Sequence, residues 1–513
     1  MSSGEKTYRV DMLTRVEGEG RFYLQVKDGE ATVARLSIFE APRFFEAFLR
    51  GRSLHEVPDI VARICGICPV AYQISSTRAI ENALGIEPGA EIRALRRLLY
   101  CAEWIESHAL HVFLLHAPDF LGYPSAIEMA ADHREVVECG LEMKKTGNAL
   151  IEVLGGRAVH PISVRVGGFT KAPSMEDLLS LRPVLATGLQ EAVETVGWAA
   201  ALPTPDFEQD YVFVALEGDA YPLERGDRIS ISGRGTYPVE EFENLFEEQQ
   251  VEHSNALQCR LKDGTPYMTG PVARLNLCYN KLHPIAANAL AESSLELPVK
   301  NQYRSIVVRS VELVHAFAEA IDIIDNYRRP SAPYVDALPR NASGCGATEA
   351  PRGLLYHRYK VGADGVVKEA RIVPPTSQNQ ARIEADLVSI APILLDLEHD
   401  EATLRCEQLI RSYDPCISCA THFLKLDIER DQVDAVKREA KDAVGRETGD
   451  AVKREERGIT GGAAAWGLES AARSTERPST PSNETDGSLE SGESCTIQPV
   501  ERGATEQEQD GTR

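Results

Sequence analysis

Two cysteine pairs with CxxC spacing, more than three hundred residues apart, constrain this 513-residue chain more than any other feature. Cys65 and Cys68 lie in RICGICP, and Cys416 and Cys419 lie in DPCISCATH. Four thiolates can bind zinc, an iron–sulfur cluster or a softer redox metal such as nickel. Zinc ribbons and ferredoxin clusters usually take their ligands from neighbouring loops, whereas here the whole fold must join the two pairs. Such a site is buried and suits a very small substrate, but the residues alone leave zinc, iron–sulfur, catalytic soft metal and coincidence open.

The net charge and the lack of long apolar segments exclude some classes of partner and location. The net charge of -23 argues against nucleic acid or an anionic membrane as the main partner, because both need a basic surface. The N-terminal sequence lacks the apolar core of a secretory signal, and no apolar run reaches the length of about 18 residues that spans a membrane. We therefore expect a cytoplasmic protein without a membrane span, whose eleven cysteines do not form a disulfide framework.

Local patterns predict a helix-dominated α+β fold. Two alternating segments that turn on Asp-Gly, at 21–38 and 353–373, predict hairpins. Shorter alternating runs near 210–235 and 268–276 predict a small sheet. Apolar residues at helical spacing, with Pro at starts and Gly at ends, predict helices at 70–85, 90–116, 176–200, 303–326, 381–397 and 401–412.

The amino-acid composition of the chain changes near residue 425. We expect a catalytic body at 1–425, with a sheet-bearing insertion at about 205–280. In the segment 426–513, DAVKRE-like hexapeptides recur every eight residues, and Gly, Ser, Thr, Pro and Glu then dominate. Such a composition cannot bury enough apolar surface to offset its ordering entropy, so we expect a charged helix followed by a disordered tail.

Several motifs that surround the cysteines carry a specific resemblance. In chain order they are RVEGEG at 15–20, RICGICP at 63–69, ESHALH at 106–111, GGRAVHP at 155–161, EAPRG at 349–353, VPPTSQN at 373–379 and DPCISCATH at 414–422. Together they resemble the large, catalytic subunit of nickel-iron hydrogenases over about residues 8–425. That fold is shared with the quinone-module subunit of respiratory complex I. The family usually has CxxCxxxH in its first cysteine motif, whereas this chain has Tyr72 at the last position. The form CGICPVAY resembles the cytoplasmic subgroup that couples hydrogen to NAD(P), including the sulfhydrogenases.

The resemblance implies a binuclear metal centre. Nickel would be held by four cysteines, of which Cys68 and Cys419 would also bridge to an iron that bears carbon monoxide and cyanide. The full ligand set is Cys65, Cys68, Cys416 and Cys419. Thiolates suit a soft, redox-active metal, and a glycine turn that leads into a helix N-terminus lowers the pKa of a thiol.

Hydrogen splitting yields a hydride and a proton, so a base must lie beside the metal. The resemblance implies that Cys416 takes the proton first and passes it to Glu17, whose carboxyl burial can tune toward neutrality. Arg352 would lie over the bimetallic centre and assist cleavage, with Asp414 as a candidate ion-pair partner. The proline segment Pro374 and Pro375, together with Thr376, would help to seat a cyanide.

A second metal ion, magnesium or iron, is also implied. Glu46, His422 and a backbone carbonyl near Gln380 match its ligand positions, although a histidine is unusual for magnesium. His160 is a candidate hydrogen-bond donor to a cysteine sulfur. His108 and His111 are expected to be core residues without a catalytic role.

Partners must carry the electrons, because the chain has neither a Rossmann glycine fingerprint nor a ferredoxin-like cysteine cluster. We therefore expect no nicotinamide, flavin or iron–sulfur cluster in this chain. The resemblance implies an iron–sulfur small subunit, flavin- and NAD(P)-binding diaphorase subunits, nickel chaperones and a maturation endopeptidase. This protease would cut after His422 and release 423–513, unless the protein keeps its tail. The alternatives are a deazaflavin- or heterodisulfide-reductase-coupled hydrogenase and a non-enzymatic complex I-like subunit, which would lack the four cysteines.

Overall fold

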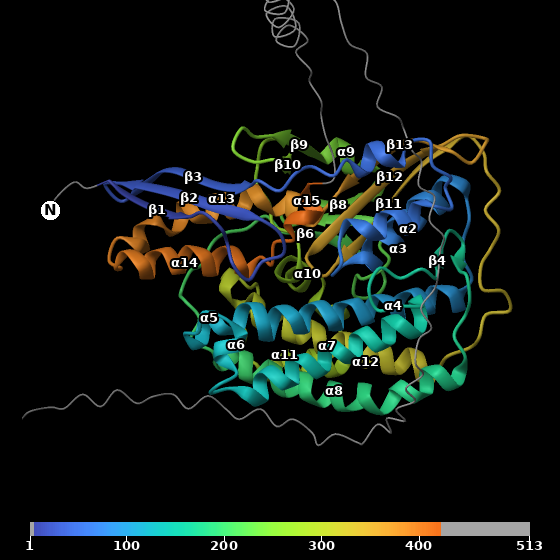
Figure 1. The fold of residues 1–513 in the computed structure, drawn as a ribbon, viewed down its shortest axis with the longest axis horizontal. Helices are drawn as coiled ribbons and strands as arrows, with labels where there is room; N and C mark the ends of the chain where they lie inside the picture. The colour runs from blue at the N-terminus through green and yellow to red at the C-terminus, as the bar shows by residue number, and fades with distance from the viewer. Residues whose placement is uncertain (1–4, 422–513) are drawn as a thin grey trace, which may run out of the picture. The chain divides into compact units, whose positions relative to one another are not determined.

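An antiparallel sheet opens the chain. The computed structural model describes residues 5–421, and Figure 1 shows their arrangement. The strands pair in the order β1-β2-β3, with bounds β1 (Lys6–Val10), β2 (Gly20–Lys27) and β3 (Glu30–Ile38). Asp28 and Gly29 both have positive φ angles between β2 and β3, as the predicted hairpin turn requires. Helix α13 (Pro375–Leu394) packs against β3, and α14 (His399–Ser412) packs against α13.

Four long helices form one layer, in the lower half of Figure 1. They are α4 (Ala90–Ala109), α7 (Arg134–Gly155), α8 (Met175–Ala201) and α12 (Ser305–Asp325). Helices α4 and α8 each contact both α7 and α12. Helix α4 continues through a π-helical segment (Leu110–His116) into α5 (Ala117–Leu121).

A second sheet carries the helix that follows the first cysteine pair. Its strands, in the order β11-β12-β13, are β11 (Ala342–Ala350), β12 (Gly353–Val361) and β13 (Val367–Val373). Helix α3 (Pro69–Leu84) packs against β11 and β12. Gly344 makes this approach possible, because a Cβ there would lie 2.4 Å from the backbone nitrogen of Ala83. Helix α3 is thereby fixed between the sheet and the helical layer.

Smaller elements complete the described part of the chain. Strands β6 (Val214–Glu217), β7 (Arg228–Ile231) and β8 (Gly235–Pro238) form one sheet, β9 (Phe246–Gln250) pairs with β10 (Leu257–Leu261), and β4 (Val164–Arg165) pairs with β5 (Gly168–Phe169). The short helices are α1 (Phe45–Leu49), α2 (Val57–Val61), α6 (Ala126–Met129), α9 (Phe242–Leu245), α10 (Pro271–Cys278), α11 (Pro284–Glu292) and α15 (Ile417–Ala420).

Most of the elements predicted from the sequence are confirmed, including both hairpins and the helix-dominated α+β class. The strand predicted at 268–276 is wrong, because Pro271 starts helix α10 there. Helix α13 begins at Pro375, six residues before the predicted start of 381. The predicted charged helix and disordered tail, 426–513, lie outside the described residues. Within 5–421, none of the helices is both long enough and apolar enough to cross a lipid bilayer.

Candidate metal centre

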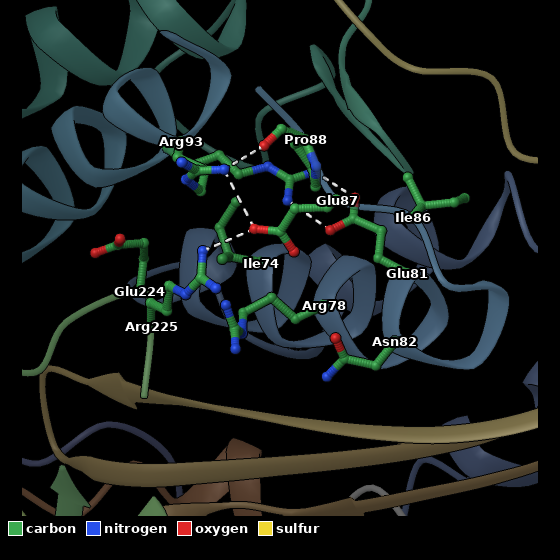
Figure 2. A pocket seen from close by; sticks show the side chains of 11 residues that line it. Ile74, Arg78, Glu81, Asn82, Ile86, Glu87, Pro88, Arg93, Glu224 and Arg225 are labelled. Atoms are coloured by element: carbon green, nitrogen blue, oxygen red, sulfur yellow. Dashed lines mark hydrogen bonds and ion pairs between the residues drawn. The ribbon is translucent and has the colours of Figure 1, made fainter. Parts of the chain in front are cut away.

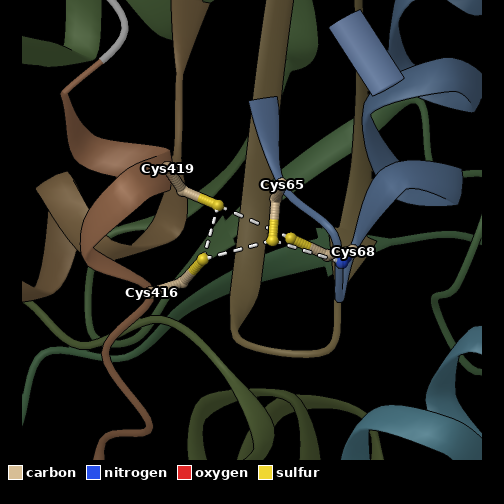
Figure 3. A group of neighbouring side chains, drawn as sticks. All are labelled: Cys65, Cys68, Cys416 and Cys419. Atoms are coloured by element: carbon tan, nitrogen blue, oxygen red, sulfur yellow. Dashed lines mark hydrogen bonds between the residues drawn. The ribbon is translucent and has the colours of Figure 1, made fainter. Parts of the chain in front are cut away.

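The four cysteines of the two CxxC pairs converge, as the sequence predicts. Their Sγ atoms all lie within 4.8 Å of one another, and all four residues are buried (Figure 3). The Sγ–Sγ distance is 3.4 Å between Cys65 and Cys416, 3.5 Å between Cys68 and Cys419, and 2.7 Å between Cys416 and Cys419. Four soft donors at this separation can share one metal ion or a small metal cluster.

The first pair is held by the start of helix α3. Cys65 follows a 3-10 turn (Ala62–Ile64), and Cys68 is the N-cap of α3. The Cys65 sulfur accepts hydrogen bonds from the amides of Ile67 and Cys68, at 3.3 and 3.4 Å. The buried carboxylate of Glu103 in α4 accepts hydrogen bonds from the amides of Val70 and Ala71, at 2.6 and 3.0 Å. Glu103 thus satisfies orphan donors of the first helical turn and fixes the position of Cys68.

The second pair is held by the N-terminal segment and by α13. The amide of Cys416 donates to Thr376 Oγ1 at 3.0 Å, and the amide of Ile417 donates to the carbonyl of Glu17 at 2.9 Å. Gly18 lies so close to this segment that a Cβ there would be 2.7 Å from Ile417 Cβ. The RVEGEG motif therefore packs directly on the second cysteine segment.

One arginine connects both cysteine segments. The Arg43 Nη2 atom donates to the carbonyl of Ile64 at 2.6 Å and also to the carbonyl of Ser418. These carbonyls immediately precede Cys65 and Cys419 in the chain. The Arg43 amide adds a hydrogen bond of 2.6 Å to the carbonyl of Thr421.

A buried carboxylate supports the same region from the helical layer. Asp119 in α5 accepts two hydrogen bonds of 2.8 Å from Arg411 and one of 2.5 Å from Arg15. Arg15 lies two residues before Glu17, and Arg411 lies five residues before Cys416. Burial opposes ionisation of Asp119, but the two guanidinium groups outweigh it and lower the pKa of the carboxyl.

The thiols of the cluster differ in pKa because they lie so close together. Hydrogen bonds from Cys416, Cys419 and Cys68 lower the pKa of Cys65 well below its ordinary value. Burial raises the pKa of Cys416 well above its ordinary value. One negative charge in the cluster disfavours the next, so a cation is needed to hold all four as thiolates.

The predicted proton acceptor lies beside the cluster. Glu17 Oε2 is 3.2 Å from Cys416 Sγ and accepts the Ser418 amide at 3.0 Å. Burial and the negative charge of Cys65 raise the pKa of the Glu17 carboxyl, while hydrogen bonds from Ser418 and Cys416 oppose the rise. The geometry allows direct proton exchange between the thiol and the carboxylate.

The predicted Arg352–Asp414 pair is confirmed. Arg352 Nη2 lies 3.0 Å from Asp414 Oδ1, and Arg352 Nε donates to the Asp414 carbonyl at 2.8 Å. A second guanidinium, Arg309 Nη1, lies 3.5 Å from Asp414 Oδ2. All three side chains are at most 2% exposed, so these charges act in a dry environment where their interaction is strong.

A small cavity opens beside the sulfur atoms. It is lined by Cys68, Tyr72, Ala350, Arg352, Leu355, Pro375, Cys416 and Cys419. On its lining, the Arg352 Nη1 atom is buried and lacks a hydrogen-bond partner among the described residues. A metal group whose outer ligands accept hydrogen bonds fits both the sulfur donors and this orphaned donor.

Of the three predicted cyanide-seating residues, Pro375 belongs to the lining of this cavity. Pro374 is the N-cap of α13, and Thr376 is buried with its hydroxyl on the Cys416 amide. Their role toward a diatomic ligand stays a prediction.

The second predicted metal site is only partly described. The Glu46 carboxylate in α1 accepts the amide of Ile372 at 2.7 Å. The side chain of Gln380 in α13 is buried and donates to the carbonyl of Leu257 at 3.1 Å. His422, the third predicted ligand, lies outside the described residues, so this site stays a prediction.

The histidines of the motifs have other partners. His160 Nδ1 lies 2.7 Å from the carbonyl oxygen of Ala62, and the hydrogen bonds found within 5–421 do not join it to a cysteine sulfur. His111 Nε2 lies 2.9 Å from the carbonyl oxygen of Arg411. His108 Nε2 lies 3.0 Å from Glu312 in α12. His108 and His111 are thus core residues, as expected from the sequence.

Another pocket, between the end of α3 and the start of α4, is occupied by ion pairs (Figure 2). Glu87 Oε1 accepts two hydrogen bonds, one from Arg93 Nη1 at 3.2 Å and one from Arg225 Nη1 at 3.0 Å. Arg96 makes two hydrogen bonds, of 2.8 and 2.6 Å, to Glu81. These pairs tie three segments together and account for the charged lining as a structural feature.

Sequence reasoning missed three residues that position the centre: Arg43, Glu103 and Asp119. Each is a charged side chain whose partners are remote in the chain, so no local spacing signals its role. Only the position of Asp119, three residues after His116 in an otherwise apolar stretch, suggests a buried charge.

Comparison with known proteins agrees with this geometry. The family model for nickel-dependent hydrogenase matches residues 43–139 and 262–422. The alpha subunit of sulfhydrogenase 1 from Pyrococcus furiosus is 34% identical over 81% of this chain and 98% of its own length. The alpha subunit of sulfhydrogenase 2 from the same organism is 36% identical over 81% of this chain and 99% of its own length. A crystal structure of an NAD+-reducing [NiFe]-hydrogenase in the H2-reduced state superposes with a TM-score of 0.74 and 26% identity, covering 81% of this chain and 99% of that one.

Proposed function

The chain belongs to the nickel-dependent hydrogenase family, and we propose that it oxidises H2 reversibly within a complex that delivers the electrons to NAD(P). It is a catalytic large subunit and an oxidoreductase that acts on H2. The proposal for the acceptor is supported by the likeness to an NAD+-reducing hydrogenase and to sulfhydrogenase alpha subunits. Because NAD(P) is a cytoplasmic cofactor, we assign the complex to the cytoplasm.

The observation that carries the mechanism is the contact of Glu17 Oε2 with Cys416 Sγ, at 3.2 Å. When bound, the nickel-iron centre supplies the Lewis acid that polarises H2 and accepts its electrons. Cys416 receives the proton on its sulfur, and Glu17 accepts it there through the existing contact. Burial favours the neutral form of the carboxyl, so Glu17 can both take and release a proton.

The remaining residues hold the group and exclude water. Cys65, Cys68, Cys416 and Cys419 would bind nickel, with Cys68 and Cys419 shared with the iron. Arg352 Nη1 and the Pro374–Thr376 segment would face the carbon monoxide and cyanide ligands on the iron. Asp414 orients the Arg352 guanidinium through two hydrogen bonds.

The test of this mechanism is Glu17→Gln, with Glu19→Gln as a matched control. Glu19 lies in the same motif but is exposed. Glu17→Gln should abolish exchange of H2 with D2O while nickel content and the infrared carbonyl and cyanide bands stay unchanged. Glu19→Gln should exchange at the wild-type rate. Full exchange by Glu17→Gln would show that another group accepts the proton.

Electrons can leave the centre where a cysteine segment reaches the surface. Gly66 is exposed although Cys65 and Cys68 on either side of it are buried. We place the iron–sulfur small subunit on this turn, with flavin- and NAD(P)-binding subunits beyond it, because electron transfer requires short distances. A Cβ at Gly66 would meet nothing within 4 Å, so the isolated chain has room for a side chain there.

Gly66→Leu should therefore keep H2/D2O exchange, which needs no acceptor, and lose H2-dependent reduction of NAD(P) by the whole complex. Gly197→Leu is the control, since this glycine is also exposed and also has open space. Equal NAD(P) reduction by both variants would contradict the docking face. The same complex, assayed with NAD, NADP, deazaflavin and polysulfide, identifies the acceptor.

Maturation would involve the end of the body. We propose that an endopeptidase cuts after His422 once nickel chaperones have loaded the site, and that Glu46, Gln380 and His422 bind magnesium or iron. The hydrogen bond from the Arg43 amide to the Thr421 carbonyl supports this, because it fixes the last described residue before the proposed cut to the segment that also contacts the cysteines. Intact mass of the nickel-loaded chain tests the cut, and a mass that includes residues beyond 422 would refute it.

A further inference from the structure

The side chain of Ser418 links the predicted proton acceptor to a second carboxylate. Ser418 lies between Cys416 and Cys419 in the chain, and its amide donates to Glu17 Oε2 at 3.0 Å. Its hydroxyl donates to Glu40, at 2.9 Å to Oε1 and 3.1 Å to Oε2. Burial raises the pKa of the Glu17 carboxyl, and both the hydroxyl and the amide of Ser418 oppose this rise through hydrogen bonds. The hydroxyl therefore lies within reach of both carboxylates.

The surroundings hold the Glu40 carboxylate against Ser418. Glu40 Oε2 lies so close to Gly18 that a Cβ on this glycine would be 2.7 Å from it. The backbone carbonyl of Glu40 accepts a hydrogen bond of 3.3 Å from Asn255 Nδ2. Three residues further along the chain, the Arg43 guanidinium donates to the carbonyl of Ser418 itself. Contacts at Glu40 and just after it thus fix this segment to the second cysteine segment.

The arrangement provides a route to water for a proton on Glu17. The oxygen that receives the proton, Glu17 Oε2, contacts Cys416 Sγ at 3.2 Å on one side and the Ser418 amide on the other. A hydroxyl can accept one proton while it donates another, so Ser418 can pass a proton on without becoming charged. The side chain of Glu40 is partly exposed, so its carboxyl can exchange protons with water. Glu17 is partly exposed as well, which makes direct release to water the competing route.

We propose that Ser418 and Glu40 form the exit route for the proton that Glu17 receives. This rests on the proposed function, in which Glu17 takes the proton from Cys416. The O–H bond of the Glu17 carboxyl breaks as its proton moves to Ser418 Oγ, and the original hydroxyl proton of Ser418 moves to an oxygen of Glu40. Glu17 is left as a carboxylate, Ser418 as a neutral hydroxyl and Glu40 as a carboxylic acid, which gives its proton to water. One proton leaves, and no electron is transferred.

The test compares two reactions of H2 in the purified, nickel-loaded complex carrying Glu40→Gln. Glutamine keeps an oxygen that accepts from Ser418, but it does not take up a proton. Exchange of H2 with D2O requires the proton to leave, so its rate should fall about a hundredfold or more. Conversion of para-H2 to ortho-H2 requires only splitting and recombination at the centre, so it should continue. A residue that merely supports the fold would lower both rates together.

Other variants test the route by restoring it. Glu40→Ala removes the carboxyl at a partly exposed position, so acetate added to the buffer should restore its D2O exchange in proportion to the acetate concentration. Ser418→Thr retains the hydroxyl and should exchange much faster than Ser418→Ala. Glu19→Gln is the control, because it removes an exposed carboxylate of the same motif as Glu17, and it should exchange at the wild-type rate.

Infrared spectroscopy gives a readout that does not depend on turnover. In H2-reduced complex, the C=O stretch of the protonated Glu17 carboxyl is the band that Glu17→Gln lacks. After transfer to D2O this band should move to lower wavenumber quickly in wild type and slowly in Glu40→Gln, because the proton stays on Glu17. Nickel content and the carbonyl and cyanide bands should be the same in both.

Each outcome supports or overturns the route. Wild-type D2O exchange in Glu40→Gln overturns the inference and shows that Glu17 releases its proton directly to water. Equal exchange by Ser418→Ala and Ser418→Thr overturns it too, as does a loss in Glu40→Ala that acetate does not restore. A parallel loss of D2O exchange and para-H2 conversion in Glu40→Gln would make Glu40 a support of the centre and also overturns it. Full exchange by Glu17→Gln would instead overturn the proposed mechanism on which the route rests.

Discussion

Replacement of Arg43 by methionine should separate the two cysteine segments. In the protein, Arg43 Nη2 donates to the carbonyls of Ile64 and Ser418, and these contacts are partly buried. A hydrogen bond from a charged donor contributes about 1.5–3 kcal/mol, and the lower end applies to a partly exposed group. Two such bonds give about 3 kcal/mol, which is roughly a hundredfold in the equilibrium for docking the last segment. Methionine keeps most of the aliphatic length, so the loss is mainly that of the donors.

The assay is amide hydrogen exchange of the metal-free chain, in which no metal bonds link the pairs. The amides of Cys416, Ile417 and Ser418, which are bonded to Thr376 and Glu17, should exchange roughly a hundredfold faster in Arg43→Met than in wild type. The loaded variant should also release nickel faster to a chelator.

Arg52→Met is the control for Arg43→Met. Arg52 lies nearby, and its guanidinium lies 4.5 Å from the centroid of the Phe48 ring. Such an exposed cation–π contact contributes only about 0.5–1 kcal/mol. If Arg43→Met and Arg52→Met exchange these amides and release nickel at the same rates, the inference that Arg43 joins the segments is refuted.

Two further predictions concern buried charges. The lowered pKa of Asp119 means that its pairing with Arg411 stabilises the fold above the ordinary value of 3.8 and that this stability is lost as pH falls through the folded pKa. Asp119→Asn should thus have an unfolding free energy about 3–5 kcal/mol lower than wild type at pH 7. In denaturant titrations this difference in unfolding free energy should narrow below pH 3.8. A difference that does not depend on pH would contradict the pairing. Glu312→Gln should cost about 3 kcal/mol of unfolding free energy, the lower end for a broken buried ion pair, because Arg274 at 0% exposure loses the charge of Glu312 but still pairs with Glu349 at 3.0 Å. The control Asp325→Asn breaks an exposed pair and should cost under about 1 kcal/mol; equal costs would show that burial of the pair is unimportant.

The elements that the sequence predicts well carry their signals locally. The turn between β2 and β3 needs positive φ angles, and Asp28-Gly29 provides them. Helix α3 has Pro69 at its first position and Gly85, at φ 69°, after its last. The convergence of the cysteines was also predictable, because thiolate chemistry and the surrounding motifs leave few reasons for two distant CxxC pairs.

Helix α7 escaped prediction for a physical reason. Gly140 and Gly147 lie inside it and resemble helix breakers in the sequence. In the structure they are points of close packing: a Cβ at Gly140 would lie 2.4 Å from Phe113 Cβ, and one at Gly147 would lie 2.7 Å from the Glu106 nitrogen. A glycine that permits contact and a glycine that ends a helix look the same until the neighbouring helix is known.

The position of the centre in the chain has a consequence for assembly. Cys65 and Cys416 are 351 residues apart, so the site closes only after both ends of the body have docked. Closing a loop of this length costs conformational entropy, which contacts between the two ends must offset. Such contacts are made by the side chains of Arg43, Glu17 and Asp119. A metal held by the four cysteines would add bonds across this junction, and because a ligand that binds only the folded state stabilises it, loading the metal and completing the fold would be one linked equilibrium.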